Sequence, residues 1–540
     1  MKSIKFADTK DIIYIFITFI IMLSIILAVM YLQKNNFMYN DDQAFGFATA
    51  DTIFSAVYNA PGGGFLSHFC NCFFGSVLPV ELGIHPGDFA GSHQAVINGI
   101  ITSIAFISSA LFSVFYKKSK IIFISALLFI SVFSFYFIIQ PENITLFLLH
   151  NNFYRYILIL IFFNYLILKN SQNILYVKKN SVKKIVLLSI LSFICGTCVE
   201  NIIVTVFTFY TILIIYNCIT KLILRNKPEI IVKQYTYKLN FNFYIPFIVF
   251  IISVIFYVFS PGCKEIAQAR NIDLYSLEKF LEIKSIFSIN LIFEFMQKFI
   301  DLYIIKIQAY WVTIAIFIIT GIKLTNKVSD IKKIILPLII LISILMGILA
   351  LYLTGKTMGG CFWIESEKIV TYFKITIMAP LYMYISYTIK KIKNKRYKII
   401  ISLIFIVLSI ITAAKINIKD ADEYRISAGH NRKMLGEYKE YIYESEKIIR
   451  YYYLKNETAK IRPYNKMGYV IFSKEFSGEF PAYYFDIIYR DMSGNKIKLP
   501  EFNENAIELF YKAGGSFQEN EIKEHKFTNL LDNNFVLNNK

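Results

Sequence analysis

Long apolar segments recur along the chain and alternate with short polar ones. Many of these apolar segments are near 20 residues long, which is the length an α-helix needs to cross the ~30 Å hydrocarbon core of a bilayer. The pattern predicts about eleven membrane-spanning helices, at residues 11–32, 95–116, 121–139, 154–168, 185–198, 201–218, 244–260, 301–322, 334–354, 370–389 and 399–414. We therefore expect an all-α polytopic membrane domain over residues 1–414.

Residues 185–216 are apolar enough to form one helix or two. A single helix of that length would run to ~48 Å, well beyond the ~30 Å core. It would also move the basic segment that follows to the opposite face of the membrane. Two short helices that meet at CGTCVEN avoid both problems, and they place Glu200 at the tip of a hairpin.

The first apolar segment is followed by no small-residue cleavage site, so we interpret it as a retained helix rather than a signal peptide. Residues 33–94, which come next, are predicted to form a large polar loop. After residue 414 the apolar density falls and the charges nearly balance. We predict a small α+β domain over residues 415–540. It would contain a helix at about 420–450 and strands at runs such as MGYVIFSKEF and AYYFDIIYRD.

The formal net charge is +19, which could suggest nucleic-acid binding. The positive charge lies instead in short segments between alternate apolar ones: KKSK at 117, KNSQNILYVKKNSVKK at 169, TKLILRNKPEIIVKQYTYKLNFNF at 220, KLTNKVSDIKK at 323 and KKIKNKRYK at 390. Short basic loops mark the cytoplasmic side of a membrane protein. We therefore predict a cytoplasmic N-terminus, an extracytoplasmic C-terminal domain and no nucleic-acid partner. With 56% hydrophobic residues and a mean hydropathy of +0.50, the chain is not a soluble globular protein.

Asp41 and Asp42 stand side by side just after the first apolar segment. A carboxylate at this level of the membrane could deprotonate an acceptor hydroxyl, or hold a divalent cation such as Mg²⁺ or Mn²⁺ beside a lipid phosphate. One Asp could equally cap the helix that follows. We favour the catalytic interpretation because two adjacent carboxylates open a long loop in a membrane protein.

Two further acidic positions are candidates on the same predicted side. Glu200-Asn201 lies in the apolar stretch VENIIVTV, where an ionisable residue marks a functional site by default. The alternative is an interhelical hydrogen bond to a polar neighbour such as Thr197 or Thr205. Glu142-Asn143, in QPENIT, could bind substrate or simply begin a turn or helix.

The turn Ser260-Pro261-Gly262 is followed by two cations, Lys264 and Arg270. A guanidinium there could bind a phosphate through two parallel hydrogen bonds. Snorkelling or pairing with Glu265 is the alternative. The chain has no Walker motif and no GxGxxG, which makes nucleotide-dependent chemistry less expected. We interpret Cys195 and Cys198 as buried thiols, and we expect no zinc site at the His and Cys residues of the first loop because their spacing matches no zinc motif.

Together, these motifs resemble the GT-C superfamily of integral-membrane glycosyltransferases. The closest likeness is to bacterial O-antigen-modifying glucosyltransferases and an uncharacterised relative family. The likeness rests on NDD at 40–42, GxxxEN at 196–201, SPG with a downstream Arg at 260–270, and an outside α+β tail. One departure is that the first loop carries APGGGFLSH, where the relatives have an Arg-containing motif.

The resemblance implies transfer of a sugar from a polyprenyl-phosphate donor to a surface glycan or lipid, on the outer face of the bacterial inner membrane. Asp42 or Asp41 would be the general base, with Glu200 at the sugar. Arg270 and Lys264 would bind the phosphate. Two other functions stay open: a transporter or flippase for a lipid-linked saccharide, and a non-catalytic scaffold. Clustered carboxylates at one face and the lack of an internal repeat disfavour the transporter.

Overall fold

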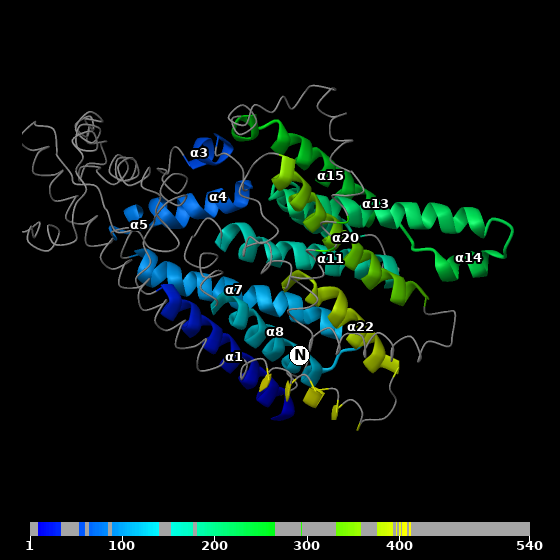
Figure 1. Ribbon diagram of the computed structural model, residues 1–540, viewed down its shortest axis with the longest axis horizontal. Coiled ribbons are helices and arrows are strands. Elements are labelled where there is room, and N and C mark those ends of the chain that lie inside the picture. The colour runs from blue at the N-terminus through cyan, green and yellow to red at the C-terminus, as the bar shows by residue number, and fades with distance from the viewer. Residues whose placement is uncertain are drawn as a thin grey trace, which may run out of the picture.

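The computed structural model describes residues 9–33, 53–59, 64–84, 89–139, 153–176, 181–264, 331–357 and 375–391, with isolated positions between 293 and 411. The regular structure in these ranges is entirely helical (Figure 1). The predicted α+β domain, residues 415–540, lies outside them, as does the predicted span 301–322.

The α-helices fall into an N-terminal and a central group. The first comprises α1 (Thr9–Gln33), α3 (Ile53–Asn59), α4 (Phe65–Cys72), α5 (Leu78–Glu81), α7 (Ala95–Ala110), α8 (Lys120–Ile139) and α11 (Ile159–Tyr176). The second comprises α12 (Val182–Gly196), α13 (Glu200–Ile223), α14 (Glu229–Tyr235), α15 (Phe241–Val258), α20 (Ile331–Thr357) and α22 (Met378–Lys391). Four short turns continue or precede them: the π-helical η1 (Phe73–Val77), η2 (Ala90–Gln94) and η4 (Tyr154–Leu158), and the 3₁₀ turn η3 (Leu111–Val114).

Six helical segments in the described ranges are long and apolar enough to cross a membrane, which makes the chain a multi-pass membrane protein. They are Ile12–Gln33, Ala90–Val114, Tyr154–Tyr176, Glu200–Ile223, Phe241–Val258 and Ile331–Ala350. Three more predicted spans coincide with the helices α8, α12 and α22. The eleventh, at 399–414, has only isolated described positions.

The described part of the predicted polar loop 33–94 is itself helical, which differs from our expectation of a loop. It contains α3, α4, η1 and α5. Apolar side chains on one face of these helices, among them Ile53, Val57 and Val77, are buried against one another. Because these segments are too short to span a bilayer, hydropathy alone does not distinguish them from loop.

Residues 182–223 form two helices, as predicted. The helix α12 ends at Gly196 and α13 begins at Glu200. The hydroxyls of Ser192 and Tyr210 lie 3.4 Å apart, although 18 residues separate them in the sequence. In one continuous helix that separation would be ~27 Å, so the chain folds back into a hairpin.

Glycines allow three helix pairs to approach closely. Gly196 of α12 packs against Ser253 and the Phe250 carbonyl of α15. Gly347 of α20 packs against the Asn201 carbonyl of α13, and Gly99 of α7 lies against the backbone of Ile26 in α1. These are also the helix pairs with the most extensive contact. Small residues at such crossings let backbones pack closely where lipid offers no hydrophobic driving force.

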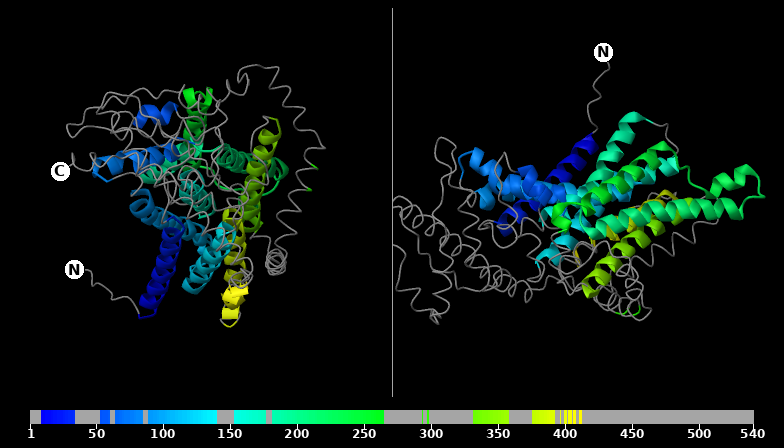
Figure 2. Two further views of the ribbon diagram at one scale, coloured as in Figure 1. Left: turned by 60° about the vertical axis from the view of Figure 1, so that its left-hand side comes forward. Right: turned by 90° about the horizontal axis from the view of Figure 1, so that it is seen from above.

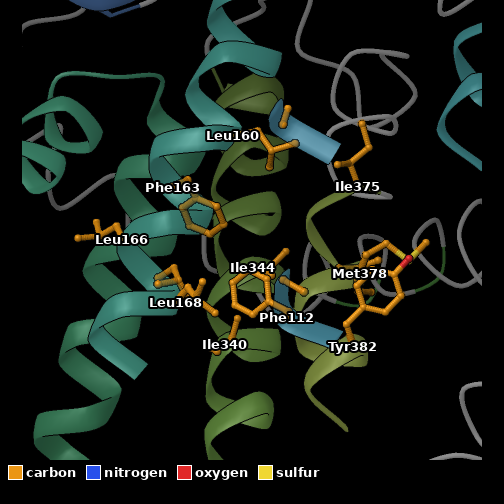
Figure 3. Packing of buried hydrophobic residues seen from close by; sticks show 14 of the residues in the cluster. Phe112, Leu160, Phe163, Leu166, Leu168, Ile340, Ile344, Ile375, Met378 and Tyr382 are labelled. Atoms are coloured by element: carbon orange, nitrogen blue, oxygen red, sulfur yellow. The ribbon is translucent and has the colours of Figure 1, made fainter. Parts of the chain in front are cut away.

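The core extends through the bundle, and one part of it lies between α11, α20 and α22 (Figure 3). Phe163 and Leu168 of α11 point toward Ile340 and Ile344 of α20. Phe112, Met378 and Tyr382 close the other side of this layer, and all seven of these side chains are buried. The helix α1, in contrast, lies at the edge of the bundle against α7 and α8 (Figures 1 and 2). Its outer face is apolar and exposed, as suits contact with lipid.

A tyrosine hydroxyl replaces the backbone hydrogen bond that a proline removes from α20. Pro337 has no N–H, so the carbonyl of Lys333 loses its helical donor. The Tyr116 hydroxyl donates to that carbonyl at 2.8 Å. The two flanking carbonyls accept from tyrosines as well: Tyr237 donates to Lys332 O at 2.7 Å, and Tyr384 donates to Ile334 O at 3.0 Å.

The hydrogen bonds of these tyrosines also connect basic segments at one end of the bundle. Tyr116 precedes KKSK, Tyr237 lies in the basic segment 220–243, and Lys332 and Lys333 end the segment 323–333. The backbone N–H of Tyr116 donates to the Ser386 hydroxyl of α22 at 2.9 Å, close to the basic segment at 390. Described residues at the segments 117, 220 and 323 therefore lie near one another, and α22, which leads to the segment at 390, joins them. Which membrane face they share stays a prediction.

Candidate functional site

The structure describes three of the predicted site residues. Glu200 is the first residue of α13 and is exposed. Asn201 follows it and is 1% exposed. Lys264 lies just after the end of α15 and is exposed. The other candidates, Asp41, Asp42, Glu142, Asn143 and Arg270, lie outside the described residues.

The tip of the α12–α13 hairpin is held by the start of α4. Gly64 has φ +89°, a conformation that L-residues rarely adopt. A Cβ on Gly64 would lie 2.7 Å from the Thr197 carbonyl oxygen and 2.8 Å from the Cα of Cys198. The next residue, Phe65, donates its backbone N–H to the Thr197 carbonyl at 3.0 Å. The last glycine of APGGGF thus permits a backbone contact beside Glu200.

Aromatic side chains connect the same region to the end of α15. Phe65 makes edge contacts with Phe256 and Tyr257 of α15, with ring centroids 5.6 Å apart in both pairs. Tyr58 of α3 stacks on Phe256 at 5.8 Å. The first-loop helices, the hairpin tip and the end of α15 therefore converge at one end of the bundle.

A cation that we did not single out from the sequence lies in this region. Arg155, on η4, lies close to the neighbouring Tyr156 hydroxyl. Its Nε is buried and has no hydrogen-bond partner among the described residues. The charges of Arg155 and Glu200 both act on the hydroxyls of Tyr156 and Tyr257. The site thus combines a carboxylate, a guanidinium and two phenols.

The Ser-Pro-Gly segment belongs to the same group. The Cys263 thiol lies beside the Ser260 and Tyr257 hydroxyls. Burial raises the pKa of Cys263 above its ordinary value, and the Glu200 carboxylate raises it further. Glu200 and the segment just before Lys264 are therefore neighbours, as the predicted topology requires.

Three π-helical turns meet beneath this site at Tyr154, the residue before Arg155. The Gln94 amide of η2 donates to the Tyr154 hydroxyl at 3.1 Å. Phe74 of η1 stacks on the Tyr154 ring with centroids 5.9 Å apart. Turns of π-helix are rare and concentrate at functional sites. Here they fix the start of η4 and with it the backbone of Arg155.

The two threonines named as possible partners of Glu200 donate their hydroxyl protons to other acceptors. Thr205 donates its hydroxyl to the Asn201 carbonyl at 2.6 Å. Thr197 donates to the Phe193 carbonyl at 3.1 Å. Each hydroxyl has a single proton and uses it within its own segment. Asn201 is buried in the contact between α13 and α20, where its Oδ1 accepts from Ile202 N–H and its Nδ2 has no partner among the described residues.

Arg155 could have been found by the argument that selected Lys264 and Arg270. It is a lone cation at the start of an apolar segment, on the face where the topology predicts few cations. It lies inside the predicted span 154–168, and we did not consider it from the sequence. What distinguishes it is its placement opposite the hairpin tip, which only the tertiary structure reveals.

The described ranges contain no group of three or more His, Cys, Asp and Glu residues able to hold a metal ion. The Cys72 side chain of α4 is buried and that of Cys70 is partly buried, and desolvation raises the pKa of each thiol to about 12. They are therefore neutral at physiological pH. Asp41 and Asp42, the residues predicted to hold a divalent cation, lie outside the described ranges, so the roles proposed below use only the chain's own groups.

Comparison of the chain with known protein families, characterised proteins and solved structures finds no match.

Proposed function

We propose that this protein is a glycosyltransferase of the bacterial inner membrane. It would transfer a sugar from a polyprenyl-phosphate donor to a surface glycan or lipid at the end of the bundle that carries Glu200. One observation supports this site above all. The charges of Glu200 and Arg155, from separate helices, act on the same two tyrosines, Tyr156 and Tyr257. A carboxylate and a guanidinium that both act on these tyrosines would provide a ligand for sugar hydroxyls and a ligand for a phosphate.

In the proposed reaction an acceptor hydroxyl attacks the anomeric carbon of the donor sugar. The bond between that carbon and the phosphate oxygen breaks, and the polyprenyl phosphate leaves with the electron pair. Asp42, or its neighbour Asp41, takes the proton from the attacking hydroxyl. Glu200 accepts hydrogen bonds from hydroxyls of the sugar and holds it in place for the attack.

Arg155 would bind the leaving phosphate. Negative charge builds up on the phosphate as the glycosidic bond breaks, and a guanidinium stabilises it through parallel hydrogen bonds. The unpartnered Nε of Arg155 is a donor available for such a bond. Lys264 and Arg270, which follow the Ser-Pro-Gly turn, would add positive charge at the rim.

The exterior of α15 suits a lipid-linked donor. Ile255, Phe256 and Phe259, near the end of α15 that carries Tyr257, are each about half exposed at 52%, 46% and 50%. A polyprenyl chain could remain in the bilayer along this apolar face. Its phosphate would then reach the level of Arg155 without leaving the membrane.

The proposal is tested by the surface glycans of a strain that lacks the gene. We expect the deletion to remove one sugar substituent from a glycan or envelope lipid, with its polyprenyl-phosphate donor accumulating. The wild-type gene should restore the sugar, whereas Asp42→Asn, which keeps volume and polarity but loses basicity, should not. An unaltered envelope in the deletion strain, or full restoration by the double variant Asp41→Asn/Asp42→Asn, would contradict it.

A further inference from the structure

The helix α13 is longer than the membrane needs. Its 24 residues rise ~36 Å, against a hydrocarbon core of ~30 Å. With Glu200 at one membrane edge, the last turn of α13 emerges at the other edge, and a short turn then leads into α14. We call residues 218–235 the α13–α14 arm. Figure 1 shows it extending beyond the other helices of the bundle.

Residues 221–230 of this arm are almost all exposed. Three aliphatic side chains are among the most exposed of the described residues: Leu222 at 76%, and Ile223 and Ile230 at 74% each. Exposed cations alternate with them, namely Lys221, Arg225 and Lys227, with Lys233 one turn further on. Apolar and basic side chains so interleaved are typical of segments that lie at the boundary between acyl chains and headgroups.

The arm is rigid where it joins the bundle. The Asn217 amide donates to the Tyr237 carbonyl and accepts from the Tyr237 N–H, both at 2.8 Å. The Tyr216 hydroxyl donates to the Tyr235 carbonyl at 3.0 Å, and the Lys332 ammonium of α20 bonds to the Lys233 carbonyl. These contacts hold α14 against α13 and α20, so the exposed cations stay at one fixed level.

The arm has a single acidic residue, Glu229, which forms an ion pair with Lys233 at 2.6 Å. The side-chain hydrogen bond from Lys233 and its charge lower the pKa of Glu229. Lys221, Arg225 and Lys227 are therefore left as a net positive surface beside exposed aliphatic side chains. That combination is complementary to an anionic bilayer surface.

We propose that the α13–α14 arm binds the headgroups of anionic phospholipids in the leaflet on the side of the basic segments. Leu222, Ile223 and Ile230 enter the acyl boundary, and Arg225 and Lys227 contact the lipid phosphates. This site lies at the opposite end of the bundle from Glu200, and it is independent of the sugar-transfer proposal.

The test is lipid binding to the purified full-length protein in detergent, measured by native mass spectrometry. Phosphatidylglycerol and phosphatidylcholine with identical chains are titrated separately. The wild type should bind phosphatidylglycerol in preference. Neutralising two basic residues, in R225Q/K227Q, should weaken that binding roughly tenfold and leave phosphatidylcholine unaffected.

The matched control is K117Q/K118Q, which removes the same charge from exposed lysines at the same end of the bundle. It should bind both lipids like the wild type. Equal losses in the two double variants would show a diffuse charge effect and overturn the proposal. Unchanged phosphatidylglycerol binding in R225Q/K227Q would also overturn it, and would indicate that another occupant, such as an acidic protein, covers the arm.

Discussion

The backbone N–H of Phe65 donates a 3.0 Å hydrogen bond to the carbonyl of Thr197. This bond joins the first loop to the tip of the α12–α13 hairpin, three residues before Glu200. It fixes the start of α4, in the described part of the first loop, beside the helix end that carries Glu200. The stability of this junction can be tested directly.

Gly64→Ala should destabilise the protein by about 2–4 kcal/mol, because it adds a close contact to an unfavourable φ. The new Cβ would press on the Thr197 carbonyl and the Cys198 Cα. The control is Gly83→Ala, since Gly83 also has a positive φ, +67°, but no atom lies within 4 Å of its Cβ position. That variant should cost only about 1 kcal/mol. Thermal unfolding of the purified protein measures both, and equal losses would contradict the close contact.

The bond from Tyr116 to the Lys333 carbonyl predicts a coupling with Pro337. Tyr116→Phe leaves a buried carbonyl without its donor and should cost about 1–3 kcal/mol. In a Pro337→Ala background, residue 337 regains an N–H that can serve this carbonyl, so the same substitution should cost clearly less. A double-mutant cycle on thermal stability compares the two. The same loss in both backgrounds would show that the tyrosine acts by some other contact.

The neighbourhood of Glu200 and Cys263 predicts a change in thiol reactivity. The carboxylate helps to raise the Cys263 pKa, so Glu200→Gln should lower that pKa. Below the pKa, a lower value means a larger thiolate fraction, and the thiolate is the reactive form. Alkylation of Cys263 should therefore be faster in the variant at a given pH, with its pH profile shifted to lower pH. Cys218, exposed at the far end of α13, is the internal control. An unchanged Cys263 rate would place Glu200 too far away to act on it.

The sequence predicted the elements well and their contacts less well. The comparison of helix length with bilayer thickness predicted two helices in residues 182–223. The spacing of the basic segments predicted that they share one membrane face. Neither argument predicts which segments that are distant in the sequence contact one another. The Gly64–Thr197 junction, the tyrosines around Pro337 and the π-helical turns at Tyr154 depend on which helices become neighbours.

Some residues of the candidate site were predicted from the sequence and others were not. Glu200 was recognised because a carboxylate in an apolar segment is expensive. Arg155 was missed because its sequence position does not show which distant residues lie near it. The helices of the first loop were missed because they are too short for a hydropathy pattern to identify. The catalytic assignment of Asp41 and Asp42 stays a prediction.

The most direct test of the proposed function is sugar transfer by the purified protein in lipid vesicles, from a polyprenyl-phosphate sugar to acceptor glycan. We expect transfer by the wild type and a loss of roughly 10²-fold or more in Arg155→Gln, because a preorganised donor to the leaving charge is removed. Arg155→Lys keeps the charge but not the planar fork, and should retain partial activity. Correctly folded Arg155→Gln and Glu200→Gln proteins that both transfer sugar at the wild-type rate would contradict the account.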